Sequence, residues 1–328
     1  MTGLSGSGDP LGPGVAALPS HLLVTGSQMR VDAVTAEVVT ALRADGIEPL
    51  LLKGPTIAGW LYDERHARPY TDTDLLVAPD AVEPAEAVLR SLAFEPFSDP
   101  IPFDRPWPAT AWVRSRDGGS VDLHHTLIGV NVSLDRAWEV LSADTETWRI
   151  GGTEVEALAP VARAVHVVLH SAQHGRGWKG PREDVTRAIE RLPRSLWVEA
   201  ARISEELQAS GAFAAGLRMT PAGEDLAREL DLPLSAPADV LLSANNPPPL
   251  AVGLEWLTRR KGVWAKVVLV ARKIALPPSE MRRWTPLARR GRTGLALAYV
   301  WRPFWLIAKL PRAVRALRRA RAEASPRE

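Results

Sequence analysis

The segment LLLKGPTIAGWLYDERHARPYTDTDLLV, residues 50–77, carries the pattern that decides the fold. An apolar run over residues 47–52 leads into it and is typical of a buried strand. Pro55 then fits the first turn of a short helix that has one apolar face. The segment ends in TDTDLLV, residues 71–77, which alternates before it turns apolar and therefore predicts a second strand entering a core.

The flanking sequence extends this strand-helix-strand unit in both directions. Apolar residues recur at helical spacing over residues 27–44 and 80–92, so we expect a helix at each place. Alternating runs joined by glycine turns predict hairpins within residues 111–124 and 145–158. This order of elements favours an α+β fold in which helices pack on a mixed sheet.

The length of the chain, 328 residues, suggests two domains, because about 150 residues is an ordinary domain size. The sequence becomes helical beyond residue 158, with breaks at proline and glycine. The first 19 residues are rich in Gly, Ser and Pro and lack the features of a secretory signal. We therefore predict a flexible leader over residues 1–19, a sheet domain over 20–158, a helical domain over 159–243, and a linker with a basic, partly amphipathic extension over 244–328.

Composition narrows the chemistry that the chain can perform. The sequence has no cysteine, which excludes disulfides, thiolate metal sites and a cysteine nucleophile. Apolar residues make up 46% and charged residues 24%, as in an ordinary folded globular protein. The formal net charge of +2 hides an asymmetry, since residues 259–328 hold 19 basic and 3 acidic residues. The chain is thus an acidic body with a basic tail.

The densest group of candidate functional residues lies on the predicted strands. Asp72 and Asp74 are two apart, so both carboxylates project from the same face of a strand. Neighbouring carboxylates repel each other unless a cation neutralises them, and Mg²⁺ accepts such ligands together with phosphate oxygens. Asp122 offers a third carboxylate if its strand lies beside that of Asp72. The pattern therefore predicts a magnesium and phosphate site.

Other residues near this group could contact a phosphate. Lys53-Gly54 lies between a strand and a helix, where a glycine lets backbone N–H groups approach an anion and the lysine adds charge. Arg68 either reaches a phosphate or is an exposed loop arginine. His124 shares a strand face with Asp122 and is therefore expected to line the same site.

Three histidines, His166, His170 and His174, recur every four residues on a predicted helix. Such a stripe can ligate a transition metal, but packing and hydrogen bonding are the more common use. Trp178, in a glycine-rich turn just after them, either stacks on a base or is an ordinary surface or core tryptophan.

Taken together, several stretches resemble a known enzyme family. The sequence is similar to the polymerase-beta-type nucleotidyltransferase superfamily, and within it to the bacterial group called uncharacterised nucleotidyltransferases. The resemblance extends from about residue 30 to residue 320, and the wider superfamily usually has Gly-Ser or Gly-Gly where this chain has Lys53-Gly54. It rests on LLKGPTIAGWLY, RPYTDTDLLV, VDLHH, LAPVARAVHVVLHSAQHG and LPPSEMRRWTPLARRGRTGLALAYVWRPF.

This resemblance implies a polymerase-beta-like mixed sheet followed by a helical domain, and an enzyme in the cytoplasm. Its reaction would move a nucleoside monophosphate from an NTP, with ATP expected, to an unidentified acceptor hydroxyl and release pyrophosphate. By position in the motifs, Asp72, Asp74 and Asp122 would hold Mg²⁺ or Mn²⁺, and Asp122 would help to deprotonate the acceptor. The residues that would contact the nucleotide phosphates are Lys53, Gly54, Arg68 and His124.

Two other functions remain open from the sequence. A catalytically inactive nucleotide-binding or membrane-docked accessory protein would have the same fold, although a decayed site has no physical reason to keep three repelling carboxylates together. Phosphotransfer of the kinase type would share Mg²⁺ and NTP but would release a nucleoside diphosphate.

The basic tail has three interpretations. Residues 295–310 are apolar and aromatic, but Arg302-Pro303 interrupts them, so we expect them not to span a bilayer. The favoured interpretation is a helix that covers the acidic body. The alternatives are contact of residues 294–321 with an anionic membrane surface, which would make the protein peripheral, and contact with nucleic acid, the weakest of the three.

Overall fold

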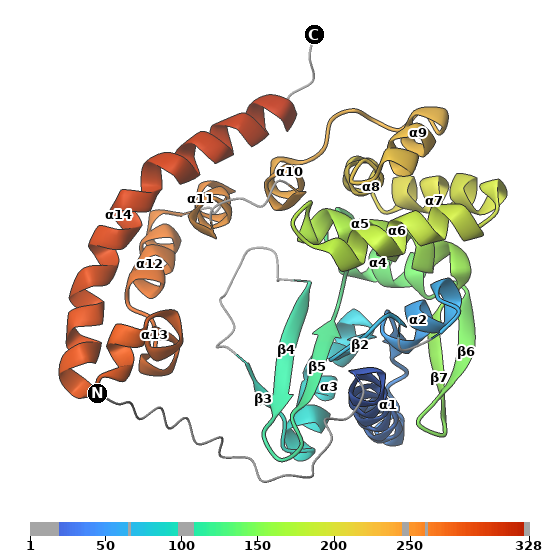
Figure 1. The fold of residues 1–328 in the computed structure, drawn as a ribbon, viewed down its shortest axis with the longest axis horizontal. Coiled ribbons are helices and arrows are strands. Elements are labelled where there is room, and N and C mark those ends of the chain that lie inside the picture. The colour runs from blue at the N-terminus through green and yellow to red at the C-terminus, as the bar shows by residue number, and fades with distance from the viewer. Residues whose placement is uncertain (1–19, 65–66, 98–107, 245–248, 260–261, 325–328) are drawn as a thin grey trace, which may run out of the picture.

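The computed structural model describes residues 20–64, 67–97, 108–244, 249–259 and 262–324 (Figure 1). The predicted leader, residues 1–19, lies outside the described residues, as do residues 245–248 of the predicted linker.

A seven-stranded sheet forms the centre of the fold, in the order β3-β4-β5-β2-β1-β7-β6. Strand β2 runs parallel to β5 and β1 runs parallel to β7, whereas the other neighbours are antiparallel. The sheet is therefore mixed, as predicted, and both predicted hairpins are present. Its strands are β1 (Leu50–Leu51), β2 (Thr73–Leu76), β3 (Glu95–Pro96), β4 (Ala109–Arg114), β5 (Gly119–His124), β6 (Thr145–Ile150) and β7 (Thr153–Leu158).

Helices surround the sheet and continue beyond it. The first helix begins at Ser20 rather than at residue 27 as predicted, because its first turns are largely exposed and carry no apolar periodicity. The N-terminal helices are α1 (Ser20–Ala44), α2 (Pro55–Leu61), η2 (Pro79–Ala81), α3 (Val82–Ser91) and α4 (Leu134–Leu141). The central ones are α5 (Pro160–His174), α6 (Lys179–Arg191), α7 (Arg194–Glu206), α8 (Ser210–Leu217) and α9 (Pro221–Glu229). The C-terminal ones are α10 (Ala238–Ala244), α11 (Pro249–Arg259), α12 (Val263–Ile274), α13 (Pro278–Trp284), η3 (Pro286–Arg289) and α14 (Gly291–Ala324).

The two faces of the sheet bury different sets of helices. Leu75 packs with residues of α1 and α3 on one face, and Leu76 packs with residues of α2 and α5 on the other. This alternation is the period of two that a strand imposes on its side chains. The core on the α5 side includes side chains from both sides of residue 158, so the sheet and the helices that follow it share one core.

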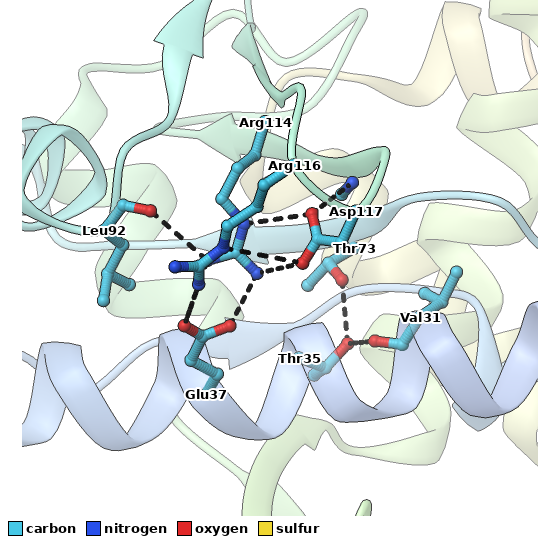
Figure 2. Close-up of polar contacts among 9 residues, drawn as sticks. Val31, Thr35, Glu37, Thr73, Leu92, Arg114, Arg116 and Asp117 are labelled. Atoms are coloured by element: carbon cyan, nitrogen blue, oxygen red, sulfur yellow. Dashed lines mark hydrogen bonds and ion pairs between the residues drawn. The ribbon is translucent and has the colours of Figure 1, made fainter.

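Polar contacts fix helix α1 to the back of the sheet (Figure 2). Arg114 of β4 is buried and donates to both carboxylate oxygens of Glu37, at 3.0 and 2.6 Å, and to Asp117 in the β4–β5 turn. The hydroxyls of Thr35 and Thr73 lie 2.8 Å apart. Because Thr73 points towards α1, its neighbour Asp74 must project from the opposite face of β2.

The C-terminal helices form a layer of their own. Helix α14 packs on α10, α11, α13 and η3, and Figure 1 shows it as a long helix along one edge of the molecule, away from the sheet. Among the described residues, α14 packs mainly on the helices directly before it rather than over the acidic body as predicted, and Arg321 pairs there with Glu255 at 2.8 Å.

Arg302-Pro303 interrupts the apolar run of this segment but not the helix, since α14 continues through Pro303 and Pro311. Arg302 faces inward, donates from Nε to the carbonyl of Lys273 at 2.9 Å, and stacks on Trp284. A charged side chain is accommodated inside the layer because it has these partners. No helix among the described residues is long and apolar enough to cross a membrane.

Candidate active site

The pairing of β2 with β5 brings the predicted carboxylates together. The two strands are parallel, and Asp74 lies directly opposite Asp122 in the register. Since residues opposite each other in a sheet share a face, both side chains project towards the α5 side. The condition set by the sequence, that the Asp122 strand lies beside the Asp72 strand, is met.

Lys53 lies between the two aspartates of the TDTD motif. Its Nζ is 3.0 Å from Oδ2 of Asp74 and 3.5 Å from Oδ2 of Asp72. The lysine side chain is 15% exposed and that of Asp74 is 1% exposed, so this ion pair is screened little by solvent. The ammonium therefore supplies positive charge at the place where the carboxylates would otherwise repel each other.

His124 contacts Asp74 from the other side. Its Nε2 lies 3.1 Å from Oδ1 of Asp74. Among the described residues, Asp74, Asp122 and His124 are the group whose ligand atoms could hold a metal ion, all within 4.8 Å of one another. Asp72, predicted as a ligand, does not belong to this group; its carboxylate lies 3.5 Å from Lys53.

The pKa values of the three carboxylates are shifted in different directions. Burial alone would raise the pKa of Asp74, but the charge of Lys53 and the hydrogen bond with His124 outweigh burial and hold this pKa well below its usual range. Burial, together with the charges of Asp74 and Asp72, raises the pKa of Asp122 to about 6. Burial and the charge of Asp74 also raise the pKa of Asp72. The negative charge of Asp122 is therefore the one that a further cation would stabilise most.

The donor set fits a divalent cation. Within the described part of the chain, Oδ2 of Asp74 is buried beside the Lys53 ammonium, and Nδ1 of His124 is buried without a hydrogen-bond partner. Carboxylate oxygens suit Mg²⁺ and Mn²⁺, and an imidazole shifts the preference towards Mn²⁺ and other transition metals.

Gly54 provides the bend that places Lys53. It has φ +75° and ψ −117°, a conformation that residues with a Cβ atom rarely adopt. A Cβ atom at this position would lie 3.6 Å from the ring of Tyr70, which is an ordinary contact. The backbone conformation, rather than lack of space, is therefore what requires glycine between β1 and α2.

Arg68 is buried in an ion pair, not exposed on a loop. Its Nε and Nη2 donate to the two carboxylate oxygens of Asp184 in α6, at 2.9 and 2.7 Å. Tyr62 donates to the same carboxylate at 2.8 Å. Asp184 was missed as a partner because 116 residues separate it from Arg68. This contact fixes the loop before β2 to the helices after the sheet.

The predicted histidine stripe lies on α5. The ring centroids of His166 and His170 are 5.9 Å apart, those of His170 and His174 are 4.4 Å apart, and Trp178 lies 5.2 Å beyond His174. His166 approaches the carbonyl of Leu52 at 3.2 Å, which joins α5 to the end of β1. Within the described residues these histidines are not part of a metal-ligand group.

The predicted residues therefore fall into two sets. One polar cluster, on and beside the paired strands β2 and β5, contains Lys53, Asp72, Asp74, Asp122 and His124. Arg68 lies near this cluster, where the charge of Asp74 acts on its pKa, but its guanidinium is engaged by Asp184.

The mixed sheet thus holds two strand carboxylates and a histidine around one point, a group that could hold a metal ion. The family is shown by sequence: a family model described as "Uncharacterised nucleotidyltransferase" matches residues 18–222, more than half of the chain, and the chain belongs to that family.

Structural comparison found an antigenic nucleotidyltransferase-like protein from Paracoccidioides brasiliensis. It is 18% identical, and the match covers 57% of this chain and 93% of that chain with a TM-score of 0.34. A search of curated proteins found no match.

Proposed function

We propose that the protein is a magnesium-dependent nucleotidyltransferase. It would move a nucleoside monophosphate from an NTP, ATP in the first instance, to an acceptor hydroxyl and release pyrophosphate. The observation that carries this proposal is the parallel β2–β5 pair, which sets Asp74 opposite Asp122 with His124 and Lys53 beside them. Membership of the nucleotidyltransferase family supports the same chemistry.

The metal-binding role is proposed for Asp74 and Asp122, with His124 as a neighbouring ligand and Asp72 joining when Lys53 moves to substrate. Bound Mg²⁺ or Mn²⁺ would neutralise charge on the phosphoryl oxygens and acidify the acceptor hydroxyl. Asp122 would also accept the proton of that hydroxyl. Burial and the acidic neighbours raise the pKa of Asp122 to about 6, and a cation bound beside it would lower this pKa, so that Asp122 would be ionised and able to accept a proton near neutral pH.

The phosphate-binding role is proposed for Lys53, Gly54, Arg68 and His124. Lys53 would exchange one carboxylate partner for a phosphate oxygen, and Gly54 would let the backbone approach the same phosphates. Arg68 would act through its charge, because Asp184 already occupies its guanidinium. Phosphoryl transfer of this kind depends mainly on positioning and on charge neutralisation, which these residues can supply.

The helices of residues 159–243 are proposed to cover the substrate. The Arg68–Asp184 pair holds α6 against the loop before β2, and the histidines of α5 lie close enough to Lys53 for its charge to lower their pKa further, after burial. Because NTP and magnesium are supplied inside the cell, the proposed reaction takes place in the cytoplasm.

An accessory protein that binds nucleotide without turnover is the alternative. The ion pairs of Lys53 favour it, since the lysine already offsets part of the carboxylate charge in the absence of metal.

Labelled nucleotides separate these functions. The protein would be incubated with Mg²⁺, a cell extract as the source of acceptor, and ATP labelled at the α or at the γ phosphate. Transfer of the α label with release of pyrophosphate is expected, and transfer of the γ label would instead indicate a kinase. Binding of a non-hydrolysable ATP analogue without transfer would indicate the accessory protein, and absence of both binding and transfer would contradict the nucleotide proposal.

A further inference from the structure

Helix α14 has an apolar outer face. Its inner face, which includes Ala298 and Leu317, packs on the C-terminal helices. The opposite side presents large apolar side chains every three or four residues, which is the spacing of one helical stripe. These side chains are 54% exposed at Leu297, 64% at Val300, 55% at Trp301, 62% at Phe304 and 66% at Ile307.

Helix α12, which contacts α14, carries a second exposed stripe. Trp264 is 78% exposed, and Val263, Val267 and Val270 are also exposed at helical spacing. We call these residues of α12 and α14 together the apolar patch. A helix that is apolar on every side is normally buried, and large exposed apolar patches mark sites of interaction. Something other than water is therefore expected to cover this patch.

The charge around the apolar patch indicates what covers it. Residues 262–322 contain 15 basic residues and one acidic residue, Glu280. The exposed stripe of α14 continues beyond Ile307 into Arg312 and Arg315, which are exposed at the same helical spacing. Apolar and aromatic side chains in line with arginines match a surface with an apolar interior and anionic headgroups.

We propose that α12 and α14 dock the protein in the plane of an anionic membrane surface, with the apolar patch in the lipid and the arginines at the headgroups. A second copy of this chain is disfavoured, because two faces of the same strongly positive charge would repel. Nucleic acid would use the arginines but gives no reason to expose Val300 and Ile307 to water. The patch lies outside residues 18–222, the part matched by the family model, so this proposal is independent of the catalytic one.

Vesicle sedimentation tests the proposal. The full chain would be mixed with vesicles of phosphatidylcholine and phosphatidylglycerol, and separately with phosphatidylcholine alone. We expect strong binding to the anionic vesicles, weaker binding to the neutral ones, and a fall in binding as salt is raised. The double variant Trp301→Ser/Phe304→Ser should bind the anionic vesicles about tenfold less tightly or weaker still, since it removes two exposed aromatic side chains that would insert into the lipid.

Two further variants serve as a control for the loss of apolar surface and as a test of the basic charge. Val198→Ser, at an exposed apolar position of α7, should bind like the wild type. Arg312→Glu/Arg315→Glu should lose the preference for anionic vesicles. No binding by the wild type, or equal binding by Trp301→Ser/Phe304→Ser, would overturn the proposal. It would also be overturned if that variant left vesicle binding unchanged but converted a dimer to a monomer by light scattering, or abolished a gel shift with RNA.

Discussion

The carboxylate cluster on β2 and β5 and the C-terminal helices place side chains in opposite surroundings. In the carboxylate cluster, charged groups are withdrawn from water: Asp74 is 1% exposed and meets Lys53 and His124. On α12 and α14, apolar groups such as Trp264 face water instead. Each arrangement opposes folding when the protein is alone, the first by repulsion among carboxylates and the second by hydration of apolar surface. Each would be relieved by a partner, a cation in one place and a lipid surface in the other.

The largest effect is expected from Asp122→Asn. This change removes the carboxylate that faces Asp74 across the β2–β5 pair, so transfer of the α label should fall about a thousandfold, the loss of several kcal/mol of charge stabilisation. Without metal, the variant should melt at the same temperature as the wild type or higher, because an uncharged asparagine side chain at this position is not repelled by the charges of Asp72 and Asp74. A transfer rate within tenfold of the wild type would remove Asp122 from the site.

A large loss of stability is expected from Arg68→Met. The change leaves the buried Asp184 carboxylate without its bidentate partner, which should lower the free energy of unfolding by about 3–5 kcal/mol in urea titrations. The control Arg202→Met removes an exposed pair with Glu199 and Glu206 and should change the free energy of unfolding much less, because solvent screens that pair. Equal costs for the two variants would mean that the Arg68 pair does not join the sheet to α6.

A smaller, pH-dependent effect is expected from His166. Burial lowers the pKa of this imidazole to about 3, against about 6.5 in an unfolded chain. Below pH 6.5 the unfolded chain therefore takes up a proton that the folded protein does not. Stability should be unaffected by this group above that pH and should fall by about 1.4 kcal/mol per pH unit below it.

The measurement is a series of urea titrations between neutral and mildly acidic pH. His166→Asn should make the slope shallower by the contribution of one histidine, whatever its effect on stability at neutral pH. An unchanged slope would show that His166 is not held neutral by burial.

The smallest effect is expected from the apolar patch. Trp301→Ser and Phe304→Ser alter side chains that face water, so each should change the free energy of unfolding by about 0.5 kcal/mol or less and leave label transfer in solution unaltered. Thermal melts of these two variants and of Arg68→Met, measured together, compare the loss of stability in the two regions. A loss of several kcal/mol in either would mean that these side chains support the fold.

The sequence predicted the strands of the carboxylate cluster and the faces of their side chains, because the signals for these are local. Alternation in TDTDLLV fixes which side chains share a face, and the glycine turns fix two hairpins. The meeting of Asp74 with Asp122 depended on β2 and β5 pairing side by side, which no local pattern specifies. The resemblance to nucleotidyltransferases supplied that step.

Other features were beyond local patterns. The short strand β3 is two exposed residues without alternation, so nothing marked it. The Arg68–Asp184 pair joins residues far apart in sequence. Arg302 and Pro303 interrupt the apolar run of the last helix, and no local pattern indicates that the carbonyl of Lys273 satisfies Arg302 while the helix continues. His124 was expected at the site from its place two residues after Asp122, but not as part of the metal-ligand group.

The central claim is that Asp74, Asp122 and His124 together bind a divalent cation. Titration of the protein with Mn²⁺, followed by the loss of the free-ion signal in electron paramagnetic resonance, tests it without any acceptor. We predict saturable binding by the wild type, binding at least about tenfold weaker in Asp122→Asn, and wild-type binding in Glu154→Gln, which changes a carboxylate on β7. No saturable binding by the wild type, or the same affinity in Asp122→Asn, would contradict the claim.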